Sequence, residues 1–402
     1  MASALSGLRV IDASQVMAGP YCAMLLADQG ADVVKVEPPD VGDATRRSLG
    51  EIQPWGESAA FLAVNRNKRS IALDLKHPDG LAVFDRLTDQ ADVMIESYRP
   101  GTAGRLGIGY ERLARRNSRL VYVSISGFGA TGPAAERGGY DIILQGASGI
   151  MSVTGTPTGD PVKAGVPLTD IGAGTLAAFG ALAALAARGQ TGRGQHVDTS
   201  LFEAGLAYGA WEATELWSSG RVPGPLGSAH RMSAPYQAIR VRDGHITIGA
   251  FTDRLFAAAT EVFGRPDWLE DARFDDGPAR LAHRAELIAA IEEVTVSDDG
   301  ATWLQRLAAA GIPAGPVNDY AAALSDPQAI ARDMVVELEH PQAGAIKMLG
   351  IPIKLSETPG AVERRPPLLG EHTSEILGEA GLTTDQISDL RERGVVEQRV
   401  EG

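Results

Sequence analysis

The N-terminal part of the chain alternates between short apolar runs rich in β-branched residues and longer segments with apolar residues at helical spacing. Short runs of this kind predict buried strands, and a repeat of about 3.6 residues predicts helices. The predicted strands are LRVIDAS, DVVKVE, SIALDL, DVMIES and LVYVSIS. Strands that alternate with helices are typical of a parallel sheet with right-handed crossovers. The predicted fold class is therefore α/β, with a large, doubly wound, Rossmann-like sheet.

The pattern changes after a helical segment near residues 201–219. A Pro- and Gly-rich connector, RVPGPLGSAH, precedes two predicted strands that are joined by a turn at Asp243-Gly244, and helical segments follow. A chain of 402 residues exceeds what one core usually serves. We therefore predict a large domain over residues 1–220, a smaller α+β domain over 221–325 and a C-terminal segment over 326–402.

Composition and charge indicate which classes of partner and which cellular location we expect. The net charge is -14, from 37 basic and 51 acidic residues, and the sequence has no basic stripe that could bind nucleic acid. We therefore expect no nucleic-acid partner. The apolar run LAAFGALAALAARG stops at Arg188, short of the roughly 20 residues that span a bilayer, and the N-terminus lacks the pattern of a signal peptide. With one cysteine, Cys22, and no Cys/His cluster at zinc spacing, we expect a cytoplasmic protein without bound metal or membrane.

Three Gly- and Pro-rich segments follow predicted strand ends, where doubly wound sheets bind ligands. They are QVMAGP, SYRPG and GFGATGP. Ordinary turn chemistry explains these residues equally well. The segments therefore predict an edge of the sheet but no particular reaction.

Asp170 stands in the segment AGVPLTDIGAG, among small and apolar residues at the start of a predicted helix. The simpler interpretation is a helix cap, because a carboxylate there satisfies free N–H groups and the helix dipole. The alternative is a reactive carboxylate that the same N–H groups keep ionised, since such a group can act as a covalent nucleophile. The small neighbours fit close approach of a ligand or of a partner helix. The pattern alone leaves both interpretations open.

Other polar residues have simple structural explanations. A basic cluster, Arg66, Lys68, Arg69 and Lys76, followed by Arg99 and Arg105, suits an anionic nucleotide-like cofactor as a group, although each residue alone fits a solvated face. Neither a Walker loop nor a G-x-G-x-x-G fingerprint is present. Asp141 fits the N-cap of its own helix, and Cys22 fits the core.

Nine segments in order resemble the family III CoA transferases, from Gly7 to about Val396. They include GLRVIDASQVMAGP, GD.TR at Gly42 to Arg46, NRNKRSIALDLK, RPGTAGRLGIGYE, VSISGFGATGP, TDIGAG and PPLLGEHTSEIL. The resemblance implies transfer of coenzyme A from an acyl-CoA to a free carboxylic acid. It identifies Asp170 as the nucleophile that forms an aspartyl-acyl anhydride and then an aspartyl-CoA thioester, without a permanently bound cofactor.

The resemblance also implies binding residues and an assembly. The residues expected around CoA and the acyl group are Val16, Met17, Ala18, Leu73, Lys76, Ser97, Tyr98, Arg105, Arg137 and Tyr140. Backbone N–H groups near Met17 and Ala18 are candidates to stabilise oxyanions. The family architecture implies an interlocked homodimer, in which the large domain takes both chain ends. The counterpart of the family's glycine-rich lid is Ile248 to Asp253, which has one glycine, Gly249.

Two alternatives and one substrate class follow from the same comparison. The first alternative is a 2-methylacyl-CoA racemase, a related branch that carries a histidine at the place of Tyr140. Tyrosine is a poor base near neutral pH, which favours the transferase. The second alternative is a CoA-binding protein without turnover. Formyl-CoA:oxalate members carry glutamine where this chain has Met17 and arginine where it has Pro38. Segments such as VNRNKRSIALDLK and MVVELEHPQAGAIKMLG look closer to the succinyl-CoA:dicarboxylate type, such as the glutarate enzyme. We therefore expect succinyl-CoA as donor and a dicarboxylate as acceptor.

Overall fold

The computed structural model describes residues 3–48, 50–53 and 56–398. Contacts divide the chain into two compact units. The first contains residues 1–150, 163–219 and 327–402, and the second contains residues 151–162 and 220–326. Sequence prediction placed boundaries at residues 220 and 325, and it did not separate residues 151–162 from the large domain.

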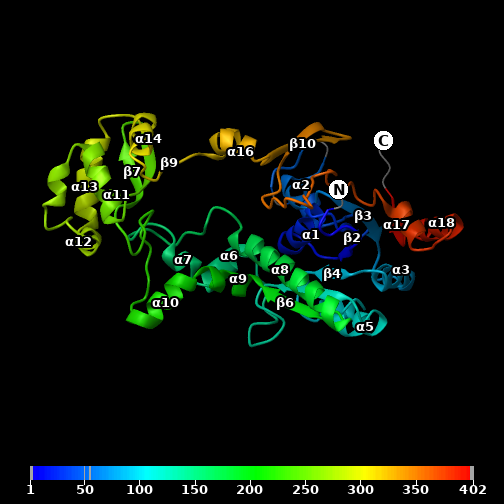
Figure 1. Cartoon of the computed structure of the whole chain (residues 1–402). Coiled ribbons are helices and arrows are strands. Elements are labelled where there is room, and N and C mark those ends of the chain that lie inside the picture. Colours follow the sequence, from blue (N-terminus) through cyan, green and yellow to red (C-terminus); the bar gives the residue numbers. More distant parts are fainter. Residues whose placement is uncertain (1–2, 49, 54–55, 399–402) are drawn as a thin grey trace. The chain divides into compact units, whose positions relative to one another are not determined.

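The first unit is built on a seven-stranded sheet in the order β12-β3-β2-β1-β4-β5-β6 (Figure 1). Its strands are β1 (Arg9–Asp12), β2 (Asp32–Glu37), β3 (Lys68–Leu73), β4 (Val93–Glu96), β5 (Val121–Ser126), β6 (His196–Ser200) and β12 (Val396–Glu397). Only β12 runs antiparallel to its neighbour within this sheet. The prediction of a large, mostly parallel α/β sheet is confirmed. From β1 the sheet grows on one side through β2 and β3 and on the other side through β4, β5 and β6. The switch point of the strand order therefore lies between β1 and β4.

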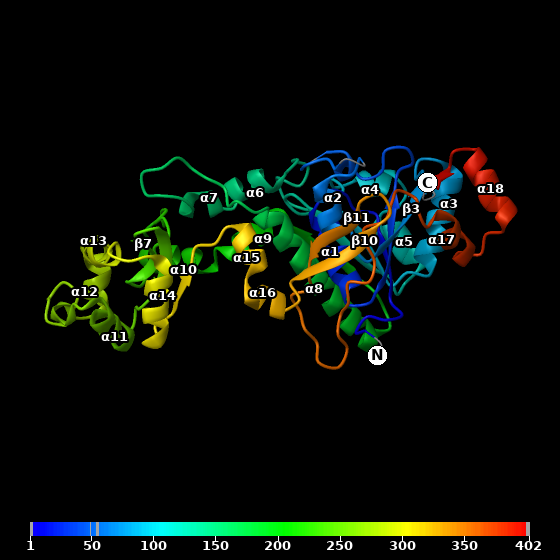
Figure 2. The same ribbon diagram turned by 90° about the horizontal axis from the view of Figure 1, so that it is seen from above.

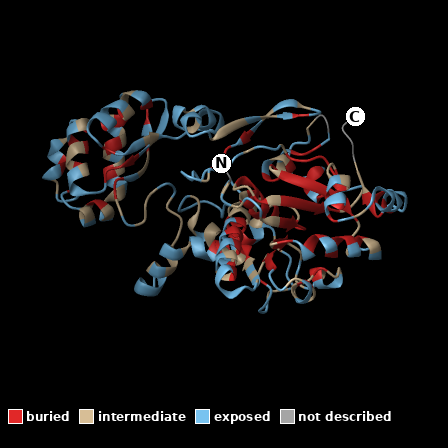
Figure 3. Ribbon diagram, turned by 45° about the vertical axis from the view of Figure 1, so that its right-hand side comes forward, coloured by how far each residue is buried: buried red, intermediate tan, exposed pale blue. Residues whose placement is uncertain are grey.

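Helices cover both faces of this sheet, and the inner strands β1 to β5 are buried, whereas β6 at one edge is only partly buried (Figure 3). One apolar cluster joins the sheet to α3, α5, α17 and α18, and another joins it to α1, α6, α8 and α9. The helices of this unit are α1 (Ala18–Asp28), α2 (Ala59–Val64), α3 (Pro78–Asp89), α4 (Thr102–Arg105), α5 (Tyr110–Arg116), α6 (Asp141–Ala147), α8 (Leu168–Thr191), α9 (Leu201–Tyr208), α10 (Ala210–Ser219), α16 (Pro327–Ala331), α17 (Thr373–Glu379) and α18 (Thr384–Glu392). A hairpin of β10 (Val335–His340) and β11 (Gly344–Leu349) belongs to the same unit, and the short α7 (Ile150–Val153) crosses into the second.

The second unit has a three-stranded antiparallel sheet of β7 (Tyr236–Val241), β8 (Gly244–Gly249) and β9 (Ala314–Pro316). Its helices are α11 (Asp253–Phe263), α12 (Gly277–Ala282), α13 (Arg284–Thr295), α14 (Gly300–Ala309) and α15 (Tyr320–Ser325). The segment Ile248 to Asp253, which the resemblance matches to the family's glycine-rich lid, is short and hydrogen-bonded within this unit. Gly249 N–H donates to Pro313 O (2.8 Å), Ala250 N–H donates to Pro235 O (3.0 Å), and Thr252 caps α11.

Helix α8 lies beside α1 and is the main helix on one face of the sheet (Figure 2). It is 24 residues long, and an 18-residue window within it has a mean hydropathy of 1.5, so by length and composition it could cross a membrane. The sequence expectation concerned the uninterrupted apolar run that stops at Arg188, whereas the whole helix, which also contains Asp170, reaches this length. Core helices of soluble proteins pass the same test, and the buried alanines of α8 belong to an apolar core cluster of the first unit.

Glycines allow α8 to approach its neighbours closely. A Cβ at Gly174 would lie 2.6 Å from the carbonyl oxygen of Ala18 in α1, and a Cβ at Gly172 would lie 2.5 Å from the Tyr208 hydroxyl in α9. The small residues after Asp170 therefore have a packing role within this chain, besides the roles that the sequence suggested.

We expect Gly174→Ala to lower the free energy of unfolding by about 1–3 kcal/mol, because a backbone carbonyl must move to admit the methyl group. Gly189→Ala is the matched control on the same helix, since a Cβ there meets no atom within 4 Å. It should stabilise the protein by about 0.5–1 kcal/mol, because alanine favours the helix. Denaturant unfolding of both variants checks the pair, and equal effects would contradict the close approach at Gly174.

Candidate active site

The carboxyl ends of β1, β4 and β5 meet at a pocket of about 290 Å³ in the first unit. This is the switch point of the sheet, where doubly wound folds bind their ligands. The lining residues are Gln15, Val16, Met17, Ala18, Ser97, Tyr98, Arg99, Pro100, Ile125, Ser126, Gly127, Arg137, Gly138, Gly139, Tyr140, Asp170 and Leu201. All three strand-end segments singled out in the sequence therefore contribute to one cavity.

Eight of the eleven predicted site residues line this pocket. They are Val16, Met17, Ala18, Ser97, Tyr98, Arg137, Tyr140 and Asp170. The other three lie elsewhere in the first unit. Leu73 is 1% exposed in the core, the Lys76 N–H binds Asp74, and the Arg105 guanidinium donates to Thr102 Oγ1 (2.8 Å) on the surface. Their assignment to CoA binding stays a prediction.

Sequence reasoning did not assign several lining residues, although a signal for them existed. Arg99 and Pro100 lie in SYRPG, and Gly127 lies in GFGATGP. A Cβ at Gly127, just after β5, would lie 3.3 Å from the backbone of Gly139, so little room for a side chain exists at this point of the wall.

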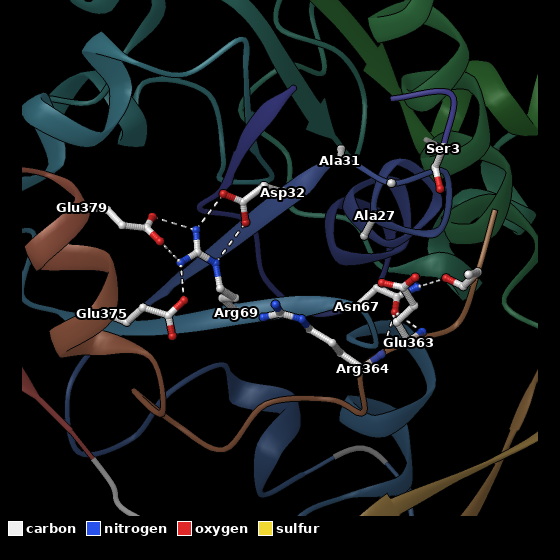
Figure 4. A pocket seen from close by; sticks show the side chains of 12 residues that line it. Ser3, Ala27, Ala31, Asp32, Asn67, Arg69, Glu363, Arg364, Glu375 and Glu379 are labelled. Carbon is white, nitrogen blue, oxygen red and sulfur yellow. Dashed lines mark hydrogen bonds and ion pairs between the residues drawn. The ribbon is translucent and has the colours of Figure 1, made fainter. Parts of the chain in front are cut away.

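Three residues of the predicted basic cluster, Arg66, Lys68 and Arg69, are paired with carboxylates within the fold. Arg66 pairs with Asp28 (2.7 Å) and Lys68 with Asp12 (2.9 Å), and both cations are buried. Arg69 faces Asp32, Glu375 and Glu379 in a second pocket of about 350 Å³ (Figure 4). The phosphate-binding and solvated-face interpretations are both wrong for these three cations, because their charges are used within the fold.

Asp170 lies in the first turn of α8 but does not cap it. The residue at the N-cap position is Pro167, and no side chain of α8 itself makes a cap hydrogen bond. Asp141, from the start of α6, takes that role. Its Oδ1 accepts hydrogen bonds from Thr169 N–H (2.9 Å) and Thr169 Oγ1 (2.8 Å). Sequence analysis expected Asp141 to cap its own helix, so the structure corrects both capping hypotheses.

The Asp170 carboxyl group is correspondingly poor in stabilising contacts. Within the described residues, no hydrogen bond or ion pair to it is found. Burial, and after it the charge of Asp141, raise the pKa of Asp170 to about 7. The expectation that helix N–H groups keep this carboxylate ionised was therefore wrong. A carboxylate that lacks solvation and partners is, when ionised, a reactive one.

We expect Asp141→Asn to lower the pKa of Asp170, because it removes the neighbouring negative charge and keeps an acceptor oxygen for Thr169. The acidic limb of the pH profile of kcat/KM should move to lower pH, which a pH-rate series measures. Gln145→Glu is the opposite test. Gln145 Nε2 donates to Asp141 Oδ2 (2.6 Å), so a carboxylate there adds negative charge and should move the limb to higher pH. An unchanged limb in both variants would show that Asp170 does not control the profile.

The N-terminus of α1 faces the same pocket. Met17 is at the N-cap position and Ala18 begins the helix, so the first N–H groups of α1 have no partner within the helix. Such groups can stabilise an oxyanion. Cys22, further along α1, is buried and free, and burial raises the pKa of its thiol, which agrees with its predicted place in the core. The described residues contain no cluster of three His, Cys, Asp or Glu side chains that could hold a metal ion.

The fold and the pocket together define a doubly wound α/β protein with a ligand site at the switch point of its sheet. The sequence model of CoA-transferase family III matches residues 5–373, and the chain belongs to this family. It is 35% identical to a human protein named succinyl-CoA:glutarate CoA-transferase, over 98% of this chain and 90% of the other. It is 39% identical to succinate–glutarate CoA-transferase of Agrobacterium fabrum (strain C58), over 93% and 95%. A crystal structure of a CAIB/BAIF family protein from Brucella suis has a TM-score of 0.85 and 39% identity, and covers 94% of this chain and 100% of that one. This chain is thus a CoA-transferase that uses CoA thioesters as substrates.

Proposed function

We propose that this chain transfers coenzyme A from succinyl-CoA to a dicarboxylic acid through covalent intermediates on Asp170. The observation that carries the proposal is the position of Asp170, an unpartnered carboxyl group with a raised pKa in the wall of the switch-point pocket. Arg99 and Arg137 line the same cavity and supply positive charge for anionic substrates. The start of α1, Met17 and Ala18, lies in that wall as well, and its first N–H groups have no partner within the helix.

The proposed reaction consists of four exchanges of activated carboxyl groups. Ionised Asp170 attacks the thioester carbonyl, the C–S bond breaks, and an aspartyl-acyl anhydride and CoA thiolate result. The thiolate attacks the aspartyl carbonyl, so the donor acid leaves and an aspartyl-CoA thioester forms. The acceptor carboxylate displaces the thiolate to give a second anhydride. The thiolate then attacks the acceptor carbonyl, which releases the new acyl-CoA and ionised Asp170.

Similarity to two enzymes named for succinyl and glutarate groups supports the donor and the acceptor class. Met17 lines the pocket, so its thioether replaces the amide that formyl-CoA:oxalate members carry at this place. An apolar side chain there favours an acceptor with a methylene chain over oxalate. The test is a screen of acceptor acids against succinyl-CoA, with product acyl-CoA measured by mass spectrometry. Glutarate and its homologues should react faster than monocarboxylates of equal length, and equal rates would contradict the dicarboxylate class.

The racemase alternative depends on a base at residue 140. Tyr140 occupies that place in the pocket, and tyrosine as a residue type is a poor base at neutral pH. Incubation of the enzyme with a 2-methylacyl-CoA in deuterium oxide, without an acceptor acid, should leave the α-proton unexchanged. Exchange at a rate comparable to CoA transfer would favour an isomerase.

A homodimer in the cytoplasm is part of the same proposal. Its support is the apolar surface of α8, α9 and α10, where Phe179 is 71%, Trp211 60% and Trp217 80% exposed. A second copy of the chain would remove this surface from water, since exposed apolar patches of this kind mark interaction sites. Analytical ultracentrifugation of the native chain should find a dimer, and a monomer at micromolar concentration would contradict it.

A further inference from the structure

Three consecutive residues, Ser14 to Val16, lead from β1 into the pocket wall, and side chains hold the backbone of each. Asp12 Oδ1 accepts from the Ser14 N–H (3.1 Å) and from the Ser14 hydroxyl. Lys35 Nζ donates to Ser14 O (3.2 Å). Ser97 Oγ accepts from the Gln15 N–H (2.9 Å) and donates to Gln15 O (3.1 Å). Asp43 Oδ1 accepts from the Val16 N–H (3.3 Å). The path of this segment is therefore set by side chains from β1, from β2, from the loop that follows β2, and from the end of β4.

The conformation of Val16 explains why such contacts are needed. Its φ is 70°, in the left-handed region that β-branched residues rarely adopt. A residue in such a conformation costs on the order of 1–3 kcal/mol and persists only where its surroundings enforce it. The side-chain hydrogen bonds to the backbone of Ser14, Gln15 and Val16 can supply this constraint.

Asp43 is the best anchored of these side chains. It is 1% exposed, its Oδ2 lies 3.0 Å from Lys35 Nζ, and its Oδ1 also accepts from Thr45 N–H (2.9 Å) and Thr45 Oγ1 (2.8 Å). Its N–H donates to Glu37 Oε2 (3.0 Å), which in turn pairs with Arg46 (2.7 Å). The GD.TR segment of the sequence thus forms one buried network whose last contact is the Val16 peptide.

Val16 is followed directly by the N-terminus of α1. Rotation about the backbone of Val16 would turn the free N–H groups at the start of α1 relative to Asp170. The distance between α1 and α8 is fixed independently, by the close approach of Gly174 to Ala18. The direction of these N–H groups therefore depends on the contacts at Ser14, Gln15 and Val16.

We infer that Asp43 is a positioning residue for CoA transfer: paired with Lys35, it holds Val16 in the left-handed conformation and so directs the N-terminus of α1 toward the reacting carbonyl. The inference rests on the proposed function for its catalytic consequence. The part of the inference that concerns the conformation of residues 14–18 is independent of the proposed function, because that conformation can be measured without any reaction.

The test is a double-mutant cycle of Asp43→Asn and Val16→Gly. Glycine adopts a positive φ at no steric cost, so the need for Asp43 should shrink when Val16 is replaced. Asp43→Asn in the native background should lower kcat on the order of 10- to 100-fold, as expected for a misplacement of about 1 Å, with KM changed less than about threefold. In the Val16→Gly background the same change should lower kcat by less than about threefold.

Asp28→Asn is the matched control, because Asp28 is also 1% exposed and paired with a buried cation, Arg66, but lies at the other end of α1. It should lower thermal stability without lowering kcat on the scale of Asp43→Asn. If Asp43→Asn does not fold, Ser97→Ala replaces it in the same cycle, since Ser97 holds the neighbouring peptide. An equal loss of kcat in both Val16 backgrounds, or a loss that appears only in KM, would overturn the inference.

Hydrogen exchange of a peptide spanning residues 14–19 separates this inference from the proposed function. Asp43→Asn should speed exchange of these amides in the native background and much less in the Val16→Gly background, while Asp28→Asn should leave them unchanged. Such coupling in a protein that transfers no CoA would confirm the positioning and contradict the proposed function. Exchange that does not respond to Asp43→Asn would overturn the positioning, whatever the activity.

Discussion

Asp170→Asn should lower kcat for CoA transfer by about 10³-fold or more, while the variant still folds and binds CoA. An amide cannot form the anhydride, so the loss is that of a nucleophile and falls on kcat more than on binding. Native enzyme incubated with succinyl-CoA should carry an adduct on the peptide that contains Asp170, and hydroxylamine should remove it. Steady-state kinetics and peptide mass spectrometry measure the two effects.

The same substitution should stabilise the protein in a defined pH range. Since burial and Asp141 raise the pKa of Asp170 from 3.8 to about 7, the folded state holds this proton more tightly than the unfolded chain. The stability that protonated Asp170 contributes is complete below about pH 3.8 and is lost as the pH rises through about 7. The variant does not titrate there. Its Tm should match the native value near pH 4 and exceed it by a growing margin up to pH 8.

Asp160→Asn is the control for both effects, because Asp160 is an exposed carboxylate outside the pocket. It should change neither kcat nor the pH dependence of Tm. A folded Asp170→Asn variant with native kcat would make Asp170 a structural residue and favour a CoA-binding protein without turnover. A variant that is less stable than the native protein at pH 8 would contradict the raised pKa.

The strands and the pocket edge could be predicted because they depend on local patterns. Apolar runs such as DVVKVE predict β2, and the Gly- and Pro-rich segments after strands predict the edge where the pocket lies. The surroundings of Asp170 could not be predicted, because they depend on which distant residue reaches it. Asp141, 29 positions earlier in the numbering, caps α8 and raises the pKa of Asp170.

The basic cluster shows the same limit. Spacing places Arg66, Lys68 and Arg69 near a strand, but it does not reveal that Asp28, Asp12 and Asp32 face them from neighbouring elements. Parallel strands bring residues together whose partners are many positions away, so the ion pairs follow from strand order, which the local pattern does not contain. The positive φ of Val16 could not be predicted either, because valine normally avoids positive φ values and its residue type gives no signal for one.

Asp12→Asn should lower the free energy of unfolding at pH 7 by about 3–5 kcal/mol, the largest stability effect that we expect. Asp12 is fully buried between two ammonium groups, Lys68 Nζ at 2.9 Å and Lys35 Nζ at 3.8 Å. Although burial opposes its ionisation, these two cations lower the pKa of Asp12. An amide leaves both lysines buried with too little compensating charge. Urea unfolding of the native and variant proteins measures the difference.

The effect of Asp12→Asn should depend on pH in a way that a simple packing defect would not. Burial outweighs the attraction of Asp12 and lowers the pKa of Lys68 to about 8. Above that pH Lys68 is neutral in the folded native protein, so Asp12 no longer gains from its charge. The difference in free energy of unfolding between the native protein and the variant should therefore narrow between pH 7 and 9. Asp89→Asn is the matched control, because its pair with Arg116 (2.7 Å) is exposed and should contribute less than about 1 kcal/mol. A difference that is constant over this range, or equal for the two variants, would show that the Asp12 pair does not determine the stability of the sheet beneath the pocket.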